Sequence, residues 1–269
     1  MSDSHEKQLA DRVAFISGGS SGINLGIAKL FASRGAKVMV FGRDDRKARN
    51  AAASLVEETG GIVIPGNADV RDPAAVATLF AKSAMAIGKP NIVIAGAAGN
   101  FVAPATGISP NGFKTVVDID LLGTFNIFRA AYDLGLAPGA SLIAITAPQG
   151  AQPLPFQAHV CAAKAGINML VKCLALEWGQ AGIRVNAISP GPIEGTEGVE
   201  RMAPTAETKQ GWIERTALRR FGTPADIGEM AAFISSPAGA YVTGTILDCD
   251  GGMKLGDASG DLLTVPARG

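Results

Sequence analysis

Short apolar runs of strand length alternate with longer, helix-length segments, and this alternation constrains the fold more than any other feature. The first cycle is an apolar run at 12–17 (RVAFIS) followed by a helical segment at 23–34. Parallel strands need a crossover between them, usually a helix. The alternation therefore predicts an α/β fold with a doubly wound parallel sheet of seven strands and helices on both faces. Further strands are expected at 37–41, 62–65, 91–95, 141–146, 183–189 and 245–250, and further helices at 46–58, 73–87, 111–135, 158–180 and 224–234.

Length and composition favour a single domain. The chain has 269 residues, 47% of them hydrophobic, which is enough for one large core, so we expect 1–269 to fold as one unit. Segment 190–222 begins with glycines and prolines and has poor strand character. We predict that it is an inserted, mobile lid over a ligand.

The charge balance argues against partners that need a strongly charged surface. Basic and acidic residues number 24 each, for a formal net charge of +0, so we expect neither a nucleic-acid nor a membrane partner. No apolar run approaches the length of a membrane span, and the three cysteines lack metal-binding spacing, so no metal site is predicted. An anionic ligand would need a local basic cluster.

A glycine-rich loop, SGGSSGIN at 17–24, follows the first predicted strand and opens the first helix. Glycines let the backbone turn tightly and approach a pyrophosphate, while the helix N-terminus offers free N–H groups and a positive dipole end. This context predicts a dinucleotide-binding loop, although a glycine-rich turn without a ligand remains the alternative. The expected contacts are Gly18, Gly19, Ser20, Ser21, Gly22 and Ile23.

Basic residues at the end of the second strand indicate which dinucleotide is bound. An acid at this place would hold the ribose hydroxyl of NAD, whereas an arginine favours the 2′-phosphate of NADP. Arg43 stands there with Arg46 nearby, so the sequence predicts NADP(H). The alternative is that Arg43 is a solvated surface charge.

Several motifs resemble the short-chain dehydrogenase/reductase family, which has the Rossmann fold. They are the glycine loop, PGPI at 190–193, YVTG at 241–244 and DGG at 250–252. The runs AAGNF at 97–101, NGFKTVVDID at 111–120, GTFN at 123–126 and PGPIEGTEG at 190–198 resemble the 2,4-dienoyl-CoA reductases, most closely the peroxisomal type. Two departures from the family pattern are Asn24, in place of the loop's third glycine, and the small-residue segment AGAAG at 95–99, which lacks the family's two asparagines.

The catalytic tyrosine of the family is absent. Four residues before Lys164 stands Val160, which cannot exchange a proton, and Ala147 and Leu122 are assigned the places of the family's serine and asparagine. Tyrosines used elsewhere in the family would fall at Gln149 and Gln157, so no alternative phenol is available. The dienoyl-CoA reductases that this chain resembles also lack the family tyrosine, so its absence is an expected feature.

The resemblance implies NADPH-dependent reduction of 2,4-dienoyl-CoA thioesters to enoyl-CoA in unsaturated fatty acid breakdown. Lys164 would bind the nicotinamide ribose and bring positive charge to the site, and Asp120 would act in catalysis through a bound water. The further cofactor contacts it implies are Asp69, Val70, Ala97, Pro190, Gly191, Pro192, Ile193 and Thr196. The acyl-CoA contacts it implies are Arg71, Phe101, Ser109, Pro110, Asn111 and Arg201.

Two other interpretations remain open at this point. One is a different reductase or dehydrogenase of the same fold acting on an unknown substrate, and the other is a cofactor-binding module without catalysis. The resemblance also implies a homotetramer. Because the chain ends in VPARG rather than in a peroxisomal address of the SKL type, we expect a cytoplasmic protein.

Overall fold

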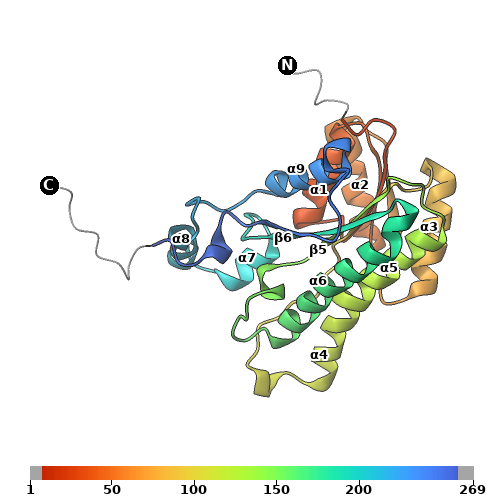
Figure 1. Ribbon diagram of the computed structural model, residues 1–269. Coiled ribbons are helices and arrows are strands. Elements are labelled where there is room, and N and C mark those ends of the chain that lie inside the picture. The colour runs from red at the N-terminus through yellow and green to blue at the C-terminus, as the bar shows by residue number, and fades with distance from the viewer. Residues whose placement is uncertain (1–7, 260–269) are drawn as a thin grey trace.

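The computed structural model describes residues 8–259 (Figure 1), and its centre is a seven-stranded parallel sheet with the order β3-β2-β1-β4-β5-β6-β7. The predicted α/β, doubly wound Rossmann fold is confirmed, since all seven strands lie within a few residues of their expected positions. The first three strands are added outward from β1 to β3, whereas β4 pairs with the other side of β1 and the later strands are added in the opposite direction. The strand order therefore has a switch point between β1 and β4. The strands are β1 Val13–Ser17, β2 Lys37–Gly42, β3 Val63–Asn67, β4 Ile92–Ala95, β5 Ser141–Ile145, β6 Arg184–Pro190 and β7 Ile246–Cys249.

Two helical layers cover the sheet, because alternate strand residues point to opposite faces. In β1, Phe15 packs with residues of α3, α5 and α6 on one face, while Ile16 packs with residues of α1, α2 and α9 on the other. Both faces are therefore apolar, as expected for a parallel sheet buried between layers. The helices are α1 Gly22–Ser33, α2 Asp45–Thr59, α3 Pro73–Ile87, α4 Pro110–Val117, α5 Gly123–Asp133, α6 Ala158–Trp178, α7 Glu197–Met202, α8 Ala206–Arg215 and α9 Pro224–Ser235.

The segment predicted as one or two helices at 111–135 forms α4 and α5, joined by a π-helical turn at Asp118–Leu122. Single π turns inside α-helices are frequent at functional sites. This one leaves Leu122 48% exposed while Asp120 is only 1% exposed. The carboxylate and not the leucine therefore faces the interior.

Segment 190–222 contains α7 and α8, two helices that the sequence did not predict. Each begins at a threonine cap: the Thr196 hydroxyl accepts from Val199 N–H, and the Thr205 hydroxyl accepts from Thr208 N–H. Both helices are short, and α8 buries none of its residues, so the apolar periodicity that marks a helix is missing. That the segment is a mobile lid remains a prediction.

Helix α6 with the turn after it, Ala158–Ala181, is the one segment of the described chain long and apolar enough to cross a membrane by length and composition. The expectation that no run approaches this length is therefore wrong. Its apolar residues Ile167 and Val171 are buried against the sheet, and core helices pass the same test.

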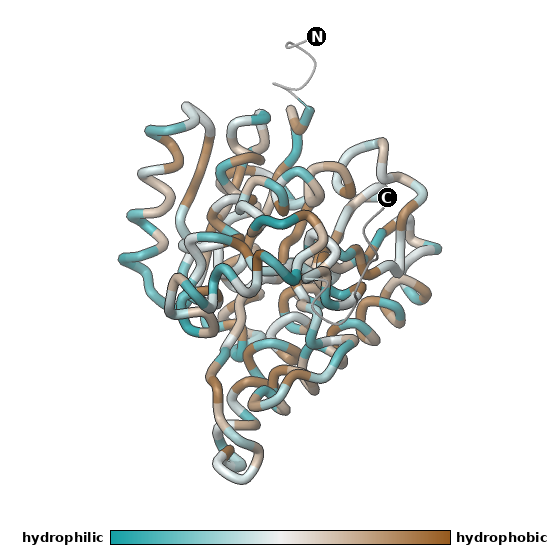
Figure 2. The backbone as a smooth tube through the Cα atoms, turned by 90° about the vertical axis from the view of Figure 1, so that its left-hand side faces the viewer, coloured by the Kyte–Doolittle hydropathy of each residue, from teal (hydrophilic) through white to brown (hydrophobic). Residues whose placement is uncertain are grey.

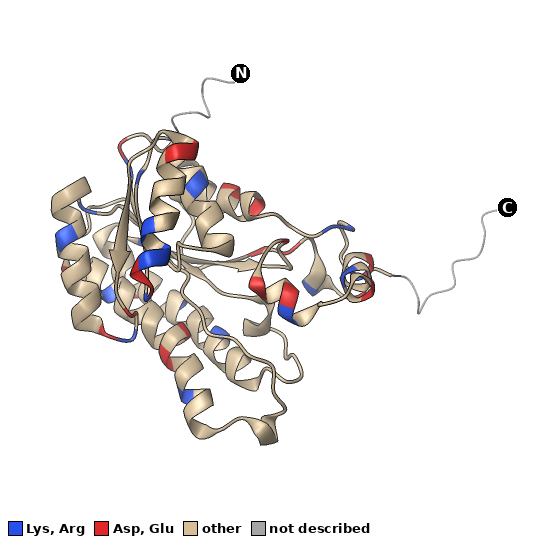
Figure 3. Cartoon of the chain, turned by 180° about the vertical axis from the view of Figure 1, so that it is seen from behind, with Lys and Arg blue, Asp and Glu red and all other residues tan. Residues whose placement is uncertain are grey.

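Apolar positions recur along the strands and helices rather than gathering in one stretch (Figure 2). Residues of both charge signs are interspersed along the chain (Figure 3).

Candidate active site

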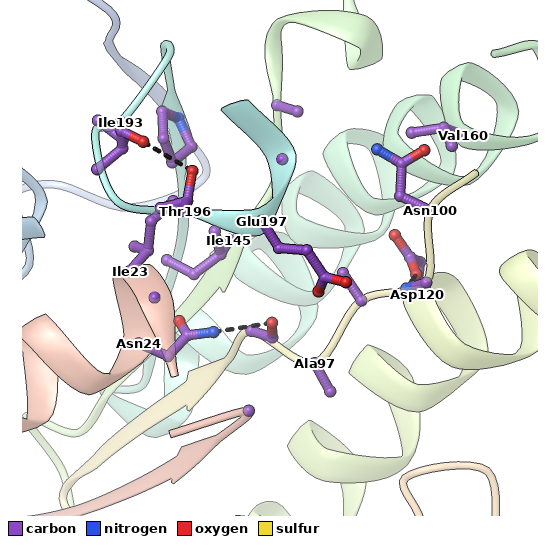
Figure 4. Close-up of a pocket in the computed structure, with 18 of the residues that line it drawn as sticks. Ile23, Asn24, Ala97, Asn100, Asp120, Ile145, Val160, Ile193, Thr196 and Glu197 are labelled. Carbon is purple, nitrogen blue, oxygen red and sulfur yellow. Dashed lines mark hydrogen bonds between the residues drawn. The ribbon is translucent and has the colours of Figure 1, made fainter. Parts of the chain in front are cut away.

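A cavity of about 1240 Å³ lies at the carboxyl ends of the strands. The loops after β1, β2, β3, β4, β5 and β6 contribute to its wall, and α7 and α8 contribute from the side. Ligands of open α/β sheets bind at this edge, next to the switch point of the strand order. Figure 4 shows residues of several of these loops converging on the same space.

The glycine loop has the geometry of a pyrophosphate cradle. Gly18 and Gly22 have φ angles of 64° and 55°, in the left-handed region that favours glycine. A Cβ on Gly19 would lie 2.9 Å from Val40, so this glycine allows the loop to pack directly on β2. Ser21 caps α1 without a side-chain hydrogen bond, which leaves N–H groups of the first turn for an anion. The loop therefore fits a dinucleotide.

Asn24 and Gly96 are two departures from the family pattern that explain each other. The Asn24 side-chain nitrogen donates to the Gly96 carbonyl at 2.9 Å. A Cβ on Gly96 would lie 2.2 Å from Asn24 Oδ1. The Asn24 amide thus fills the space that a side chain at position 96 would need, and it ties α1 to the end of β4 (Figure 4).

Two basic side chains lie where the second strand meets the cavity. Arg43 and Lys47 both line it, whereas Arg46, which the sequence singled out, points elsewhere on the exposed start of α2. Lys47 follows Asp44, whose carboxylate accepts from Lys47 N–H and caps α2. The helical turn therefore brings position 47 rather than 46 to the cavity. The sequence alone does not show which side of this helix faces the cavity.

Lys164 and Asp120 form a buried ion pair in the cavity wall. Lys164 Nζ lies 3.0 Å from Asp120 Oδ2, and the two side chains are 8% and 0% exposed. Asp120 Oδ1 accepts from Gly99 N–H at 2.7 Å, and Lys164 Nζ donates to the Ile145 carbonyl at 3.2 Å. Because both charges are paired and hydrogen-bonded, their burial is tolerated. The pair places a fixed cation and a fixed anion side by side, next to Val160.

Three amides form a network close to this pair. Gln149 Nε2 donates to Gln157 Oε1 at 3.0 Å, and Gln157 Nε2 donates to Asn100 Oδ1 at 3.1 Å. Gln157 is only 1% exposed, while Asn100 lines the cavity. Since the Asn100 oxygen is occupied by Gln157, its NH₂ group is the end left to donate to a ligand. Sequence reasoning missed this network because Asn100 is 57 residues away from Gln157 along the chain.

His159 is buried behind the cavity rather than facing it. It is 0% exposed and stacks on Phe101 with ring centroids 4.1 Å apart. Burial lowers the pKa of His159, against the opposing influences of the Phe101 backbone and of the Asp120 charge. The ring therefore acts as an apolar support for the loop that carries Asn100.

The residues predicted to contact acyl-CoA do not line this cavity. Arg71 is engaged with Asp69, and its hydrogen bonds hold the pKa of Asp69 below the ordinary value. Arg201 donates to the Asn100 carbonyl at 2.7 Å, which joins α7 to the loop after β4. Ser109 caps α4, where Pro110 and Asn111 form the exposed first turn, and Phe101 packs on His159. Their contacts with a substrate remain predictions.

Most of the predicted cofactor-binding residues lie in the wall of the cavity, and their contacts with a cofactor remain predictions. The exceptions are Gly19, which is buried behind the loop, and Arg46. Those that line it are Gly18, Ser20, Ser21, Gly22, Ile23, Arg43, Asp69, Val70, Ala97, Lys164, Pro190, Gly191, Pro192, Ile193 and Thr196.

Comparison with known proteins decides the family. The family model described as Enoyl-(Acyl carrier protein) reductase matches residues 18–254. The chain belongs to the short-chain dehydrogenase/reductase family. It is 40% identical over 259 residues to the peroxisomal 2,4-dienoyl-CoA reductase [(3E)-enoyl-CoA-producing] of Rattus norvegicus, covering 95% of this chain and 88% of the relative. The corresponding enzyme of Saccharomyces cerevisiae is 41% identical over 245 residues, covering 90% and 84%.

Solved structures of short-chain dehydrogenases agree with this assignment. A gluconate 5-dehydrogenase from Burkholderia cenocepacia, in complex with NADP and tartrate, matches with a TM-score of 0.87 at 27% identity and covers 93% of this chain and 98% of its own. A short chain dehydrogenase from Bacillus anthracis matches with a TM-score of 0.81 at 35% identity, covering 92% and 97%. The chain is accordingly an oxidoreductase whose Rossmann fold binds a nicotinamide cofactor.

The family comparison corrects one expectation. The chain was expected to be cytoplasmic because its last residues do not form an SKL-type address, but those residues lie outside the described part of the structure. Relatives that cover most of the chain, from Danio rerio to Arabidopsis thaliana, carry peroxisomal in their names. The cytoplasmic expectation is therefore wrong.

Proposed function

We propose that this short-chain reductase catalyses the NADPH-dependent reduction of 2,4-dienoyl-CoA thioesters to enoyl-CoA during unsaturated fatty acid breakdown. The observation that carries the proposal is the buried Lys164–Asp120 ion pair beside Val160, in a site that has no phenol. Reduction of a ketone to an alcohol needs an acid that gives a proton to the carbonyl oxygen, and the side chain of Val160 cannot supply one. Reduction of a conjugated thioester instead needs donors at the thioester oxygen and a proton delivered to carbon.

NADPH rather than NADH is proposed because two cations stand where the second strand meets the cavity. Arg43 and Lys47 are exposed, line the wall and have no ion-pair partner among the described residues. A guanidinium and an ammonium group together suit the doubly charged 2′-phosphate. When bound, the nicotinamide cofactor supplies the hydride.

The Asn100 amide and the Lys164 ammonium are proposed to stabilise the negative charge that the reduction places on the thioester oxygen. Asn100 is oriented from behind by Gln157, and Lys164 is held by Asp120 and by the Ile145 carbonyl. Donors fixed before the reaction need no reorganisation as charge develops, which is the main source of electrostatic catalysis.

A water molecule held at the Lys164–Asp120 pair is proposed as the source of the proton that reaches carbon. The carboxylate itself is engaged by Lys164 and by Gly99 N–H. A water bound beside it is polarised by both charges and can pass on a proton without a phenol.

Segment 190–222 is proposed to be the substrate lid within the single reductase domain. It contributes Val199, Met202, Trp212 and Arg215 to the cavity wall, and Arg201 connects it to the Asn100 loop. Apolar groups suit the acyl chain, and the guanidinium of Arg215 suits a phosphate of the CoA group. The homotetramer implied by the family is likewise a proposal.

The experiment that tests the proposed function is identification of the product. Purified protein is incubated with NADPH and 2,4-hexadienoyl-CoA, and the thioesters are separated and weighed by mass spectrometry. We expect a hexenoyl-CoA with one carbon–carbon double bond fewer than the substrate. Unchanged hexadienoyl-CoA in the presence of bound NADPH would favour a different substrate or a non-catalytic cofactor-binding module.

A further inference from the structure

A second cavity of about 610 Å³ lies at the amino-terminal edge of the sheet, opposite the active site. Its wall includes Arg12, which immediately precedes β1, and Arg184, the first residue of β6. Ser235 at the end of α9 and Thr243 before β7 are among the other polar residues of its wall. None of these four residues takes part in the site described above.

The two arginines form a cationic site without an anion. Arg184 is only 9% exposed, and its guanidinium donates to the Gly239 carbonyl at 2.9 Å and to the Val242 carbonyl at 3.4 Å. No carboxylate lines the cavity, and neither arginine forms an ion pair with a residue of the described range 8–259. Burial and the nearby charge of Arg12 both lower the pKa of Arg184. A buried cation with a second cation beside it is costly unless an anion joins them.

Two hydroxyl groups in the same wall have donor capacity to spare. Ser235 is 2% exposed, and its Oγ has no hydrogen-bond partner among the described residues, although a helical serine usually donates to a carbonyl one turn earlier. The Thr243 hydroxyl accepts from Val185 N–H at 3.1 Å, so its own hydrogen is free to donate. The cavity thus gathers hydrogen-bond donors and positive charge.

We propose that this amino-edge cavity binds a small oxyanion of the phosphate class, held by the guanidinium groups of Arg12 and Arg184 and the hydroxyls of Ser235 and Thr243. A phosphate group has several acceptor oxygens and a double negative charge, which match two cations and two hydroxyls. The phosphate can be free in solution or part of a small metabolite, because the cavity is larger than a single ion needs.

The test is titration calorimetry on the full-length protein saturated with nicotinamide cofactor, so that the active-site loop cannot take up the added anion. Inorganic phosphate and glycerol 3-phosphate are titrated separately at constant pH and ionic strength. Saturable binding of inorganic phosphate is expected if the free ion is the ligand, and tighter binding of glycerol 3-phosphate if the ligand is a phosphorylated metabolite.

Three variants assign the binding to this cavity. Arg12→Gln is expected to weaken binding at least about tenfold, because a charge-assisted hydrogen bond is lost, and Ser235→Ala is expected to weaken it less. Lys82→Gln, which removes an exposed charge on α3 that does not line this cavity, should bind as the unmodified protein does. The absence of saturable binding, or equal affinity in Arg12→Gln and the unmodified protein, would overturn the proposal.

Discussion

At the scale of single residues, the site replaces a phenol with an ion pair. Lys164 and Asp120 are each fixed by a second contact, to the Ile145 carbonyl and to Gly99 N–H. Removal of one charge leaves the other buried without a partner, which costs several kcal/mol of local stability or reorganises the site. The pair therefore acts as one unit.

The first prediction concerns Asp120. Asp120→Asn is expected to lower kcat for a dienoyl-CoA by about 100-fold or more, because the bound water that supplies the proton loses the carboxylate that polarises it, while NADPH affinity changes little. Turnover and cofactor binding are measured separately, by NADPH consumption and by fluorescence titration. Asp118→Asn is the matched control, since Asp118 lies in the same π turn but pairs with the exposed Lys114. Full activity in Asp120→Asn would remove this residue from the mechanism.

The second prediction concerns the contact between Asn24 and Gly96. Gly96→Ala places a Cβ 2.2 Å from Asn24 Oδ1 and is expected to weaken cofactor binding and lower Tm. Combining it with Asn24→Gly should restore both, because the asparagine no longer occupies the space. Equal damage in the single and double variants would show that the two residues are not coupled.

The third prediction concerns Arg43. Arg43→Ala is expected to raise the Kd for NADPH by about 10- to 100-fold, since a charge-assisted hydrogen bond to the 2′-phosphate is lost, with little change for NADH. Lys47→Ala should have the same direction of effect, and Arg46→Ala, outside the cavity wall, should have none. Equal losses for the two cofactors would contradict the assigned role of Arg43.

At the scale of elements, the seven strands and most helices could be predicted because each combines an apolar period with a clear boundary. Asp72 with Pro73, for example, marks the start of α3, and both bounds of that helix agree with the prediction. Helices α7 and α8 could not be predicted, because they are short and their apolar pattern is weak. The π turn was also invisible in the sequence, which indicated Asp120 as a catalytic residue but not that Asp120 is buried while Leu122 is exposed.

The fourth prediction concerns the start of α9. Arg220 and the Thr223 cap both bond Asp226, and the hydrogen bonds from Arg220 hold its pKa well below the ordinary value. A depressed carboxyl pKa stabilises the fold above about pH 4 and ceases to do so as pH falls through the folded-state pKa. Asp226→Asn should cost about 1 kcal/mol at neutral pH, and less in strong acid.

Urea denaturation at neutral and acidic pH checks this expectation. Asp133→Asn serves as the control, because Asp133 is paired with Arg129 on an exposed helix face and should change stability little at any pH. A cost for Asp226→Asn that is independent of pH would contradict the assigned role of the carboxylate.

At the scale of the whole molecule, one edge of the sheet carries the chemistry and the opposite edge carries the cationic cavity. Helices α5 and α6 expose large apolar side chains, including Phe125, Met169 and Leu176. Such surfaces fit the homotetramer proposed from the family. The fold class followed from periodicity alone, whereas the Lys164–Asp120 contact and the Gln157–Asn100 network depend on how distant segments pack.

The measurement that tests the central claim most directly compares rates of NADPH consumption with 2,4-hexadienoyl-CoA and with 2-hexenoyl-CoA, using NADH as the cofactor control. The site without a phenol is predicted to turn over the dienoyl thioester with NADPH at least about 100-fold faster than the enoyl thioester. Only the dienoyl thioester can accept the hydride at a carbon two double bonds away from the thioester and still spread the developing charge to the thioester oxygen. Equal rates for the two thioesters, or no consumption of NADPH with either while the cofactor still binds, would contradict the account.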